Sequence, residues 1–169
     1  MRRFFRYLLA AILGIAIAIG AMILEGETLE SVVFNIPDVP VINFATLQRG
    51  PTPNQYLLCP TKLCQTQTDG EAPVFDVSVS KLRADWDELI ADQPRVQVLR
   101  RDLTNEQVDY VQRSRVFRFP DIITVRFLPV DATHATLAIY SRSVYGKDDL
   151  GVNRARVEEW LTRLKAQSG

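Results

Sequence analysis

Histidine and cysteine are scarce in this sequence, which contains one His and two Cys in 169 residues. A zinc site ordinarily uses three or four protein ligands, drawn mainly from these two residue types. The chain therefore lacks the ligands for most zinc chemistry. We expect it to bind no metal and no cofactor.

An excess of charge of one sign is also lacking, because 20 Lys and Arg residues balance 20 Asp and Glu residues. Binding to nucleic acid depends on a surplus of cations that neutralise phosphates. A nucleic-acid partner is therefore not expected. With 47% hydrophobic and 24% charged residues, the composition is that of a folded domain rather than a disordered tail.

The N-terminus carries the most hydrophobic stretch, because Arg2, Arg3 and Arg6 precede an uncharged run over residues 7–24. As a helix this run reaches about 27 Å, close to the roughly 30 Å hydrocarbon core of a bilayer. It is longer than a typical signal-peptide core, and no clear cleavage site follows it. We expect residues 1–24 to form a cytoplasmic tip and a transmembrane anchor that contacts lipid through residues 4–24. A cleaved signal and a buried core helix are the alternatives.

The arginines place the N-terminus in the cytoplasm and export the remainder of the chain, by the positive-inside rule. We therefore predict a single-pass protein of the bacterial inner membrane with a periplasmic C-terminal domain. Residues 25–55 contain several prolines, which cannot donate backbone hydrogen bonds, and are interpreted as a spacer. Its apolar residues, such as Phe44, favour contact of part of the spacer with the domain or the membrane surface.

Cys59 and Cys64 lie near the start of the exported domain, which we assign to residues 56–169. In an oxidising compartment their spacing permits a disulfide that closes a short loop. The spacing differs from that of thioredoxin-like redox pairs. A structural disulfide is favoured, and unpaired thiols or a redox pair are the alternatives.

Periodicity predicts an α+β domain after this pair. Apolar residues recur at helical spacing in a stretch that ends at Pro94 and again over residues 153–167. We expect an antiparallel sheet of about four or five strands, with both amphipathic helices packed on one face. Alternating or apolar stretches give the predicted strands as residues 72–77, 95–101, 108–119, 122–130 and 135–144.

Three stretches towards the C-terminus are distinctive: residues 119–127 (FPDIITVRF), 139–146 (IYSRSVYG) and 149–156 (DLGVNRAR). They resemble the domain-of-unknown-function family 1499, which is largely bacterial and whose members often follow a membrane segment. The resemblance spans roughly residues 53–164. It departs from the family pattern at Val144 and Asp148, where many members have Arg and Ser. It implies a fold and an envelope setting, and brings no established reaction.

The last predicted helix begins with two cations. If Asn153 is the cap, Arg154 and Arg156 occupy the first turn, where the helix dipole disfavours positive charge. Free backbone N–H groups and two guanidiniums would together form a receptor for a carboxylate or phosphate. With Arg126 from a predicted strand and Asp121 just before that strand, these residues make a candidate anion-binding site.

The same residues also have a purely structural interpretation. Arg154 can pair with Glu158 four residues on, and Asp148 or Asp149 can neutralise Arg156. Alternatively, Asp149 is the helix cap and the arginines lie one turn deeper.

Further arginines fall on or near neighbouring predicted strands. They form either a basic patch on the sheet face opposite the helices or solvated residues paired across strands. The patch gains functional meaning if Asp121 and Tyr140 converge with it into a cleft. His134 is interpreted as a surface turn residue rather than a member of a catalytic triad. The arginines concerned are Arg113, Arg115, Arg118, Arg126 and Arg142.

No recognisable acid–base, metal or nucleotide set occurs, so we assign no catalytic residues. The leading hypothesis is a membrane-anchored envelope protein whose exported domain is a binding or assembly module. Its partner would be an envelope protein or a small anionic ligand. The alternative is an enzyme or carrier that acts on a small anionic ligand, such as a phospholipid head group or cell-wall fragment, through the candidate anion-binding site.

Overall fold

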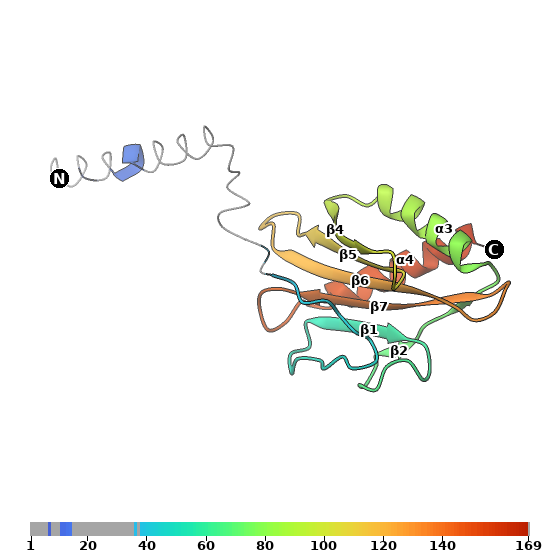
Figure 1. Cartoon of the computed structure of the whole chain (residues 1–169). Helices are drawn as coiled ribbons and strands as arrows, with labels where there is room; N and C mark the ends of the chain where they lie inside the picture. Colours follow the sequence, from blue (N-terminus) through green and yellow to red (C-terminus); the bar gives the residue numbers. More distant parts are fainter. Residues whose placement is uncertain (1–6, 8–10, 15–35, 37, 169) are drawn as a thin grey trace. The chain divides into compact units, whose positions relative to one another are not determined.

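The computed structural model describes residues 7, 11–14, 36 and 38–168 (Figure 1). Two compact units make up the chain, Met1–Val39 and Pro40–Gly169. The expected membrane anchor, residues 4–24, lies almost wholly outside the described residues. Within the part of the chain that is described, no helix has the length and apolar character needed to span a bilayer.

The second unit is an α+β domain built on one seven-stranded sheet, in the strand order β2-β1-β7-β6-β5-β4 with β3 paired to β7 (Figure 1). All pairings are antiparallel except that between β1 and β2. The elements are β1 (Gln55–Cys59), β2 (Gly70–Glu71), β3 (Val74–Phe75), α3 (Val79–Ala91), β4 (Val96–Asp102), β5 (Gln107–Arg113), β6 (Pro120–Pro129), β7 (Ala135–Ser143) and α4 (Val152–Gln167).

The sheet has more strands than the four or five predicted. Two strands were missed: β1 straddles the end of the expected spacer, and β2 is too short to show alternation. One predicted strand, residues 108–119, is shorter than expected because the chain turns after β5. The backbone N–H of Ser114 donates to Phe119 O at 2.9 Å, and Ser114 Oγ accepts from the backbone N–H of Phe119 at 3.0 Å. Residues 114–119 therefore form a loop.

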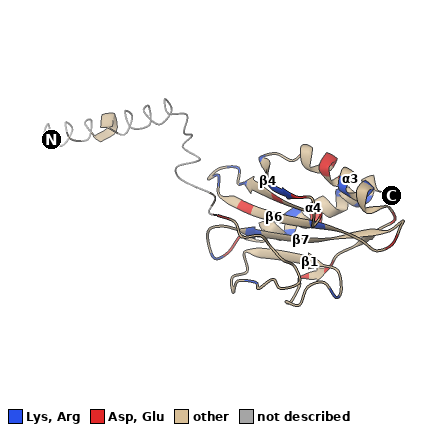
Figure 2. Cartoon of the chain, viewed as in Figure 1, with Lys and Arg blue, Asp and Glu red and all other residues tan. Residues whose placement is uncertain are grey.

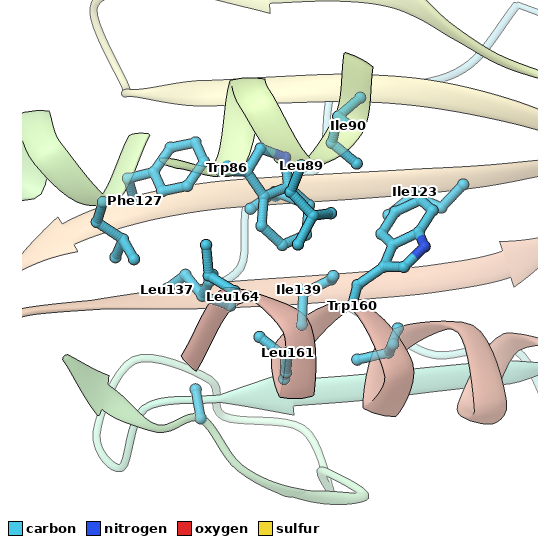
Figure 3. Close-up of a cluster of buried hydrophobic side chains, with 14 of the residues drawn as sticks. Trp86, Leu89, Ile90, Ile123, Phe127, Leu137, Ile139, Trp160, Leu161 and Leu164 are labelled. Carbon is cyan, nitrogen blue, oxygen red and sulfur yellow. The ribbon is translucent and has the colours of Figure 1, made fainter. Parts of the chain in front are cut away.

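Both helices pack on the same face of the sheet. Ser78 caps α3 by accepting a hydrogen bond from the backbone N–H of Lys81 at 3.3 Å. The ring of Trp86 on α3 meets that of Trp160 on α4 edge to face, with centroids 5.8 Å apart (Figure 3). The indole N–H of Trp86 donates to the hydroxyl of Tyr110, so this polar group is satisfied within the core. Aliphatic residues of β6 and β7, including Ile123 and Ile139, complete the cluster.

The opposite face of the sheet, called the second face below, is partly covered by residues 42–64. Phe44 and Leu47, from the expected spacer, are buried against Leu57 of β1 and Ala138 of β7. Cys59 and Cys64 form a disulfide beside this cluster, which confirms the predicted bond.

The start of α4 differs from the expectation that Asn153 is its cap. The N-cap is Gly151, whose φ of 78° is a left-handed conformation that glycine adopts without strain. Asn153 is the second residue of the helix. The carboxylate of Asp149 accepts a hydrogen bond from the backbone N–H of Asn153 at 2.8 Å, so Asp149 satisfies a donor of the first turn.

Candidate functional site

A pocket of about 250 Å³ opens at the end of the sheet where β6 begins and β7 ends. Its walls come from the loop 114–119, the loop that follows β7, and the first turn of α4. The lining residues are Ser114, Phe119, Asp121, Ser143, Tyr145, Gly146, Asp148, Asp149 and Val152.

Aromatic and aliphatic side chains form the rim of this pocket. The ring of Phe119 lies 5.8 Å from that of Phe117 and 6.5 Å from that of Tyr145, measured between centroids. Phe119 and Tyr145, which line the pocket, are 40% and 43% exposed. A group of exposed apolar side chains around a pocket mouth is typical of a surface that contacts a ligand or partner.

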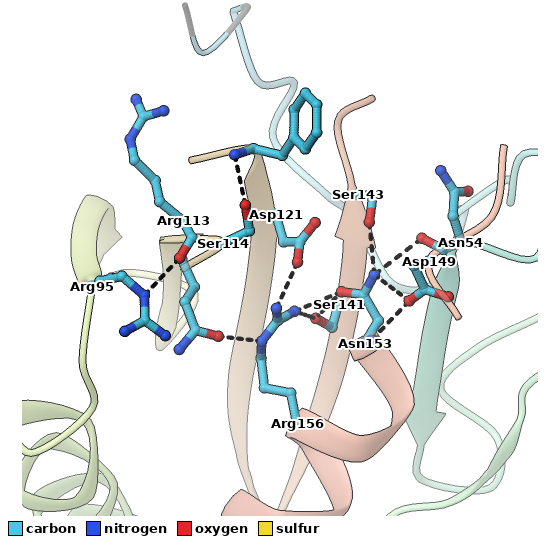
Figure 4. A network of polar contacts seen from close by, with 12 residues as sticks. Asn54, Arg95, Arg113, Ser114, Asp121, Ser141, Ser143, Asp149, Asn153 and Arg156 are labelled. Atoms are coloured by element: carbon cyan, nitrogen blue, oxygen red, sulfur yellow. Dashed lines mark hydrogen bonds and ion pairs between the residues drawn. The ribbon is translucent and has the colours of Figure 1, made fainter. Parts of the chain in front are cut away.

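The inner wall of the pocket rests on a buried ion pair. Arg156 on α4 donates from Nη2 to Oδ2 of Asp121 at 2.6 Å, and the two side chains are only 7% and 11% exposed (Figure 4). Nη1 of Arg156 donates to Ser141 Oγ at 2.9 Å and to Asn153 Oδ1 at 2.7 Å, and Nε donates to Gln112 Oε1. The guanidinium is thus held by one helix and three strands.

Asn153 connects this ion pair to the neighbouring loops. Its amide nitrogen donates to Ser143 Oγ at 3.0 Å, to Asp149 Oδ2 at 2.7 Å and to the backbone oxygen of Asn54 at 3.2 Å (Figure 4). Its amide oxygen accepts from Ser141 Oγ at 2.6 Å as well as from Arg156. Because Asn153 is fully buried, this network fixes the pocket wall rather than offering a free group to solvent.

The five residues of the candidate anion-binding site therefore do not form one site. Asp121, Asn153 and Arg156 meet in the network above. Arg154 lies on the exposed side of α4 and pairs with Glu158 at 2.8 Å, which raises the pKa of Arg154 and lowers the pKa of Glu158.

Arg126 lies on the second face, because β6 alternates and Arg126 is paired with Gln107 and Ala138 there. The structural interpretation needs one correction. Asp121, and neither Asp148 nor Asp149, neutralises Arg156. Asp148 accepts from the backbone N–H of Leu150, and Asp149 accepts from those of Gly151 and Asn153.

The basic residues on the strands are also divided. Arg142 lies over the ring of Tyr140 on the second face, with its guanidinium carbon 4.9 Å from the ring centroid. Arg115 and Arg118 belong to the loop 114–119. Asp121 points to the helix-covered face, so it does not converge with Tyr140.

The contacts of several residues with Arg156 and Asn153 were not predicted from the sequence. Ser141 and Ser143 follow the inward alternation of Leu137 and Ile139 on β7, so their direction was open to prediction. Gln112 is 44 residues from its partner Arg156, and Asn54 is 99 residues from its partner Asn153. No local sequence pattern indicates contacts over such separations.

The described residues contain no group of three or more His, Cys, Asp or Glu side chains placed to hold a metal ion. The carboxylates near the pocket instead bond to Arg156 and to backbone N–H groups.

Comparison with known proteins places the chain in a family. The model described as "Protein of unknown function (DUF1499)" matches residues 59–164, and the chain belongs to this family, as its C-terminal motifs predicted. Among solved structures, a START superfamily protein from Mycobacterium smegmatis aligns with 58% of this chain and 94% of its own, at 7% identity and a TM-score of 0.35. The search of curated proteins gave no match.

Proposed function

We propose that this protein is a membrane-anchored envelope protein whose exported domain binds a ligand or partner group in the pocket at the end of the sheet. The observation that carries the proposal is the pocket itself, which combines an exposed aromatic rim with a rigid polar wall. Preorganised walls favour binding because little conformational freedom is lost when the ligand enters.

The pocket lining favours a particular chemistry. Phe119, Tyr145 and Val152 supply apolar contact, whereas serine hydroxyls and carboxylates supply the polar atoms. The described lining contains no Lys or Arg. A ligand with an apolar body and hydroxyl or amine donors matches this lining better than an anion does.

The alternative, an enzyme or carrier for a small anion that uses all five predicted residues, has weaker support. It would need Arg154, Arg156 and Arg126 to face a common cavity. Arg156 already makes four hydrogen bonds inside the protein, and Arg154 is paired with Glu158. We therefore propose the binding or assembly module as the function.

The membrane anchor and periplasmic location are supported by the sequence and by the disulfide. Residues 7–24 carry no charge and follow three arginines, and the domain contains a Cys59–Cys64 bond. Disulfides persist in oxidising compartments such as the bacterial periplasm. Fusion of alkaline phosphatase after residue 169 is expected to give an active enzyme, and fusion of green fluorescent protein at the same place a dark one. Fluorescence without phosphatase activity would contradict export.

Occupancy of the pocket can be tested with a variant that fills its mouth. We expect Val152→Trp to remove a small molecule that co-purifies with the full chain from membranes and is detected by native mass spectrometry. Val130→Trp is the matched control, because Val130 is similarly exposed but lies beyond β6, at the opposite end of the strand. Retention of the molecule by V152W, or its absence from all three proteins, would contradict a small ligand in this pocket.

A further inference from the structure

The exposed apolar side chains of the domain are concentrated at the end of the sheet where the pocket opens. Six of the twelve large ones that the structure describes in the domain lie on two segments there, residues 114–119 and 144–152. Single apolar side chains scattered over a surface are ordinary, whereas a group marks an interaction surface. The six residues, called the apolar end below, are Val116, Phe117, Phe119, Tyr145, Leu150 and Val152.

Contacts between aromatic rings join the two segments. The ring of Phe119 lies between those of Phe117 and Tyr145, with centroids 5.8 Å and 6.5 Å away. Phe117 is 68% exposed, so this cluster of rings extends from the pocket lining into solvent. Leu150, on the other segment, is 93% exposed and stands in sequence between two lining residues of the pocket.

The backbone holds Leu150 in an unfavourable conformation. Its φ of 53° is in the left-handed region, which glycine adopts freely and leucine does not. Asp148 Oδ1 accepts from the backbone N–H of Leu150 at 2.7 Å, and Asp149 Oδ1 accepts from that of Gly151 at 3.1 Å, which fixes this turn. Neither the conformation nor the exposed side chain of Leu150 stabilises the domain in water. Transfer of that side chain from water to an apolar medium would be favourable.

The charged side chains beside the apolar end are compatible with lipid head groups. In Figure 2 basic and acidic residues can be followed on the two segments, where β6 begins and β7 ends. Three cations and two carboxylates are present, a net charge of +1: Arg115, Arg118 and Lys147 against Asp148 and Asp149. Arginine and lysine can keep their aliphatic stems among apolar groups while their charged ends reach lipid phosphates. A positive net charge is attracted to the anionic lipids of a bilayer.

The opposite end of the sheet has a different character. It is formed by the turns 103–106 and 130–134, where β4 meets β5 and β6 meets β7 (Figure 1). These turns expose Leu103 and Val130, but they contain no aromatic residue. They carry two carboxylates and no Lys or Arg. Of the two ends, the one at the pocket is therefore the better match for a bilayer surface.

The connection to the membrane anchor keeps a bilayer within reach, and this step rests on the anchor proposed above. The uncharged run ends at residue 24 and the domain begins at Pro40, so residues 25–39 connect them. Fifteen residues span at most about 50 Å, more than the roughly 33 Å of a ten-residue strand such as β6. Either end of the sheet can therefore reach the bilayer, and the tether gives the bilayer surface a high effective concentration.

We propose that the apolar end inserts into the interface of the bilayer that holds the anchor, so that the pocket opens towards lipid. The aromatic rings and Leu150 contact the upper acyl chains, and the neighbouring cations contact the head groups. A bilayer is favoured over a second copy of the chain because the tether supplies it at any protein concentration.

The test uses the full chain in vesicles of phosphatidylcholine and phosphatidylglycerol, with a tryptophan reporter at the apolar end. Phe117→Trp is the reporter, and Leu103→Trp at the opposite end is the matched control, because Phe117 and Leu103 are 68% and 66% exposed. The native Trp86 and Trp160 are buried, and the wild type measures their background emission. Bromine on the acyl chains quenches an indole that it contacts. With brominated phosphatidylcholine we expect the added Trp to lose about half of its emission in F117W and none in L103W.

Two further variants address the segment 144–152. Leu150→Trp is a second reporter, and we expect its added Trp to be quenched at least as strongly as that of F117W. Leu150→Asp, combined with F117W, replaces an apolar side chain with a negative charge at an exposed position. We expect this change to reduce the quenching of the Phe117→Trp reporter, because both segments enter the interface together.

Flotation of the vesicles after an alkaline carbonate wash reports the anchor separately. If the protein floats but F117W and L150W are quenched no more than L103W, the proposal is wrong and the anchor stands. A blue-shifted F117W emission that brominated chains do not quench would mean that a second copy or another protein covers the apolar end, which also overturns the proposal. Protein that does not float would contradict the anchor, and the proposal with it.

Discussion

Arg156 and Arg126 are both arginines withdrawn from solvent on the same sheet, but they lie on opposite faces and in different surroundings. Arg156 is surrounded by acceptors: an aspartate, a serine, an asparagine and a glutamine. Arg126 has a buried Nε with no acceptor within the described residues.

The comparison shows that burial alone does not identify a functional cation. A buried guanidinium whose donors are satisfied holds elements together, and here Arg156 joins α4 to β5, β6 and β7. A buried guanidinium nitrogen without an acceptor instead costs stability, because its lost hydrogen bond to water is not replaced. The same residue type therefore stabilises the fold on one face and carries an unsatisfied donor on the other.

The largest expected effect comes from removing the satisfied arginine. Arg156→Leu leaves Asp121 buried without its partner, which typically costs about 3–5 kcal/mol of the free energy of unfolding. Denaturant unfolding of the full chain in detergent measures this loss. Arg126→Leu is the matched control and is expected to be neutral or stabilising in chloride, because it removes an unsatisfied donor.

A double variant separates the charge from the packing. Asp121→Asn combined with Arg156→Leu removes both charges, and we expect it to recover part of the stability lost in R156L. If R156L and R126L were equally stable, the contrast between the two faces would be wrong.

Much of the domain follows from local patterns in the sequence. Leu82, Trp86 and Leu89 have the spacing of one helix face, and Ile123, Val125 and Phe127 have the alternation of one strand face. Such periodicities depend only on neighbouring residues, so they predict the helices and the long strands correctly. The short spacing of the two cysteines likewise predicted the disulfide.

Contacts between distant segments could not be predicted in the same way. The acceptor of Arg156 is Asp121, 35 residues away, whereas the sequence suggested the nearer Asp148 or Asp149. Nearby aspartates were the natural candidates because α4 was not yet docked on the sheet. Docking brings Arg156 over β6, whereas Asp148 and Asp149 accept hydrogen bonds from the backbone N–H groups of Leu150 and Asn153.

Two residues of the candidate anion-binding site, Asp121 and Arg126, could not share a site once the strand began before Asp121. Side chains alternate between the two faces of a strand, so residues an odd number of positions apart point to opposite faces. Asp121 and Arg126 are five positions apart on β6, and the register confirms that they lie on different faces. Alternation alone could have excluded a shared site for these two residues.

The smallest effect on stability is expected from an exposed ion pair, at the turn between β6 and β7. The Asp131 carboxylate raises the pKa of His134, and the backbone N–H of Thr133 together with His134 lowers the pKa of Asp131 to about 2. Folding favours protonated His134. Its contribution to the free energy of unfolding is therefore present below pH 6.5 and is lost as pH rises through the higher pKa of the folded state.

The contribution of Asp131 to the free energy of unfolding depends on pH in the opposite direction. It is present above pH 3.8 and is lost as pH falls towards the folded-state pKa of about 2. Both side chains are exposed, and solvent screens such pairs, unlike Arg156 and Asp121. Titration of the His134 imidazole by NMR is expected to show a lower pKa in Asp131→Asn than in the wild type, with little change in denaturant midpoint at pH 7. An unchanged His134 pKa would show that Asp131 is not its partner, and a loss of stability comparable to R156L would show that exposure does not separate the two pairs.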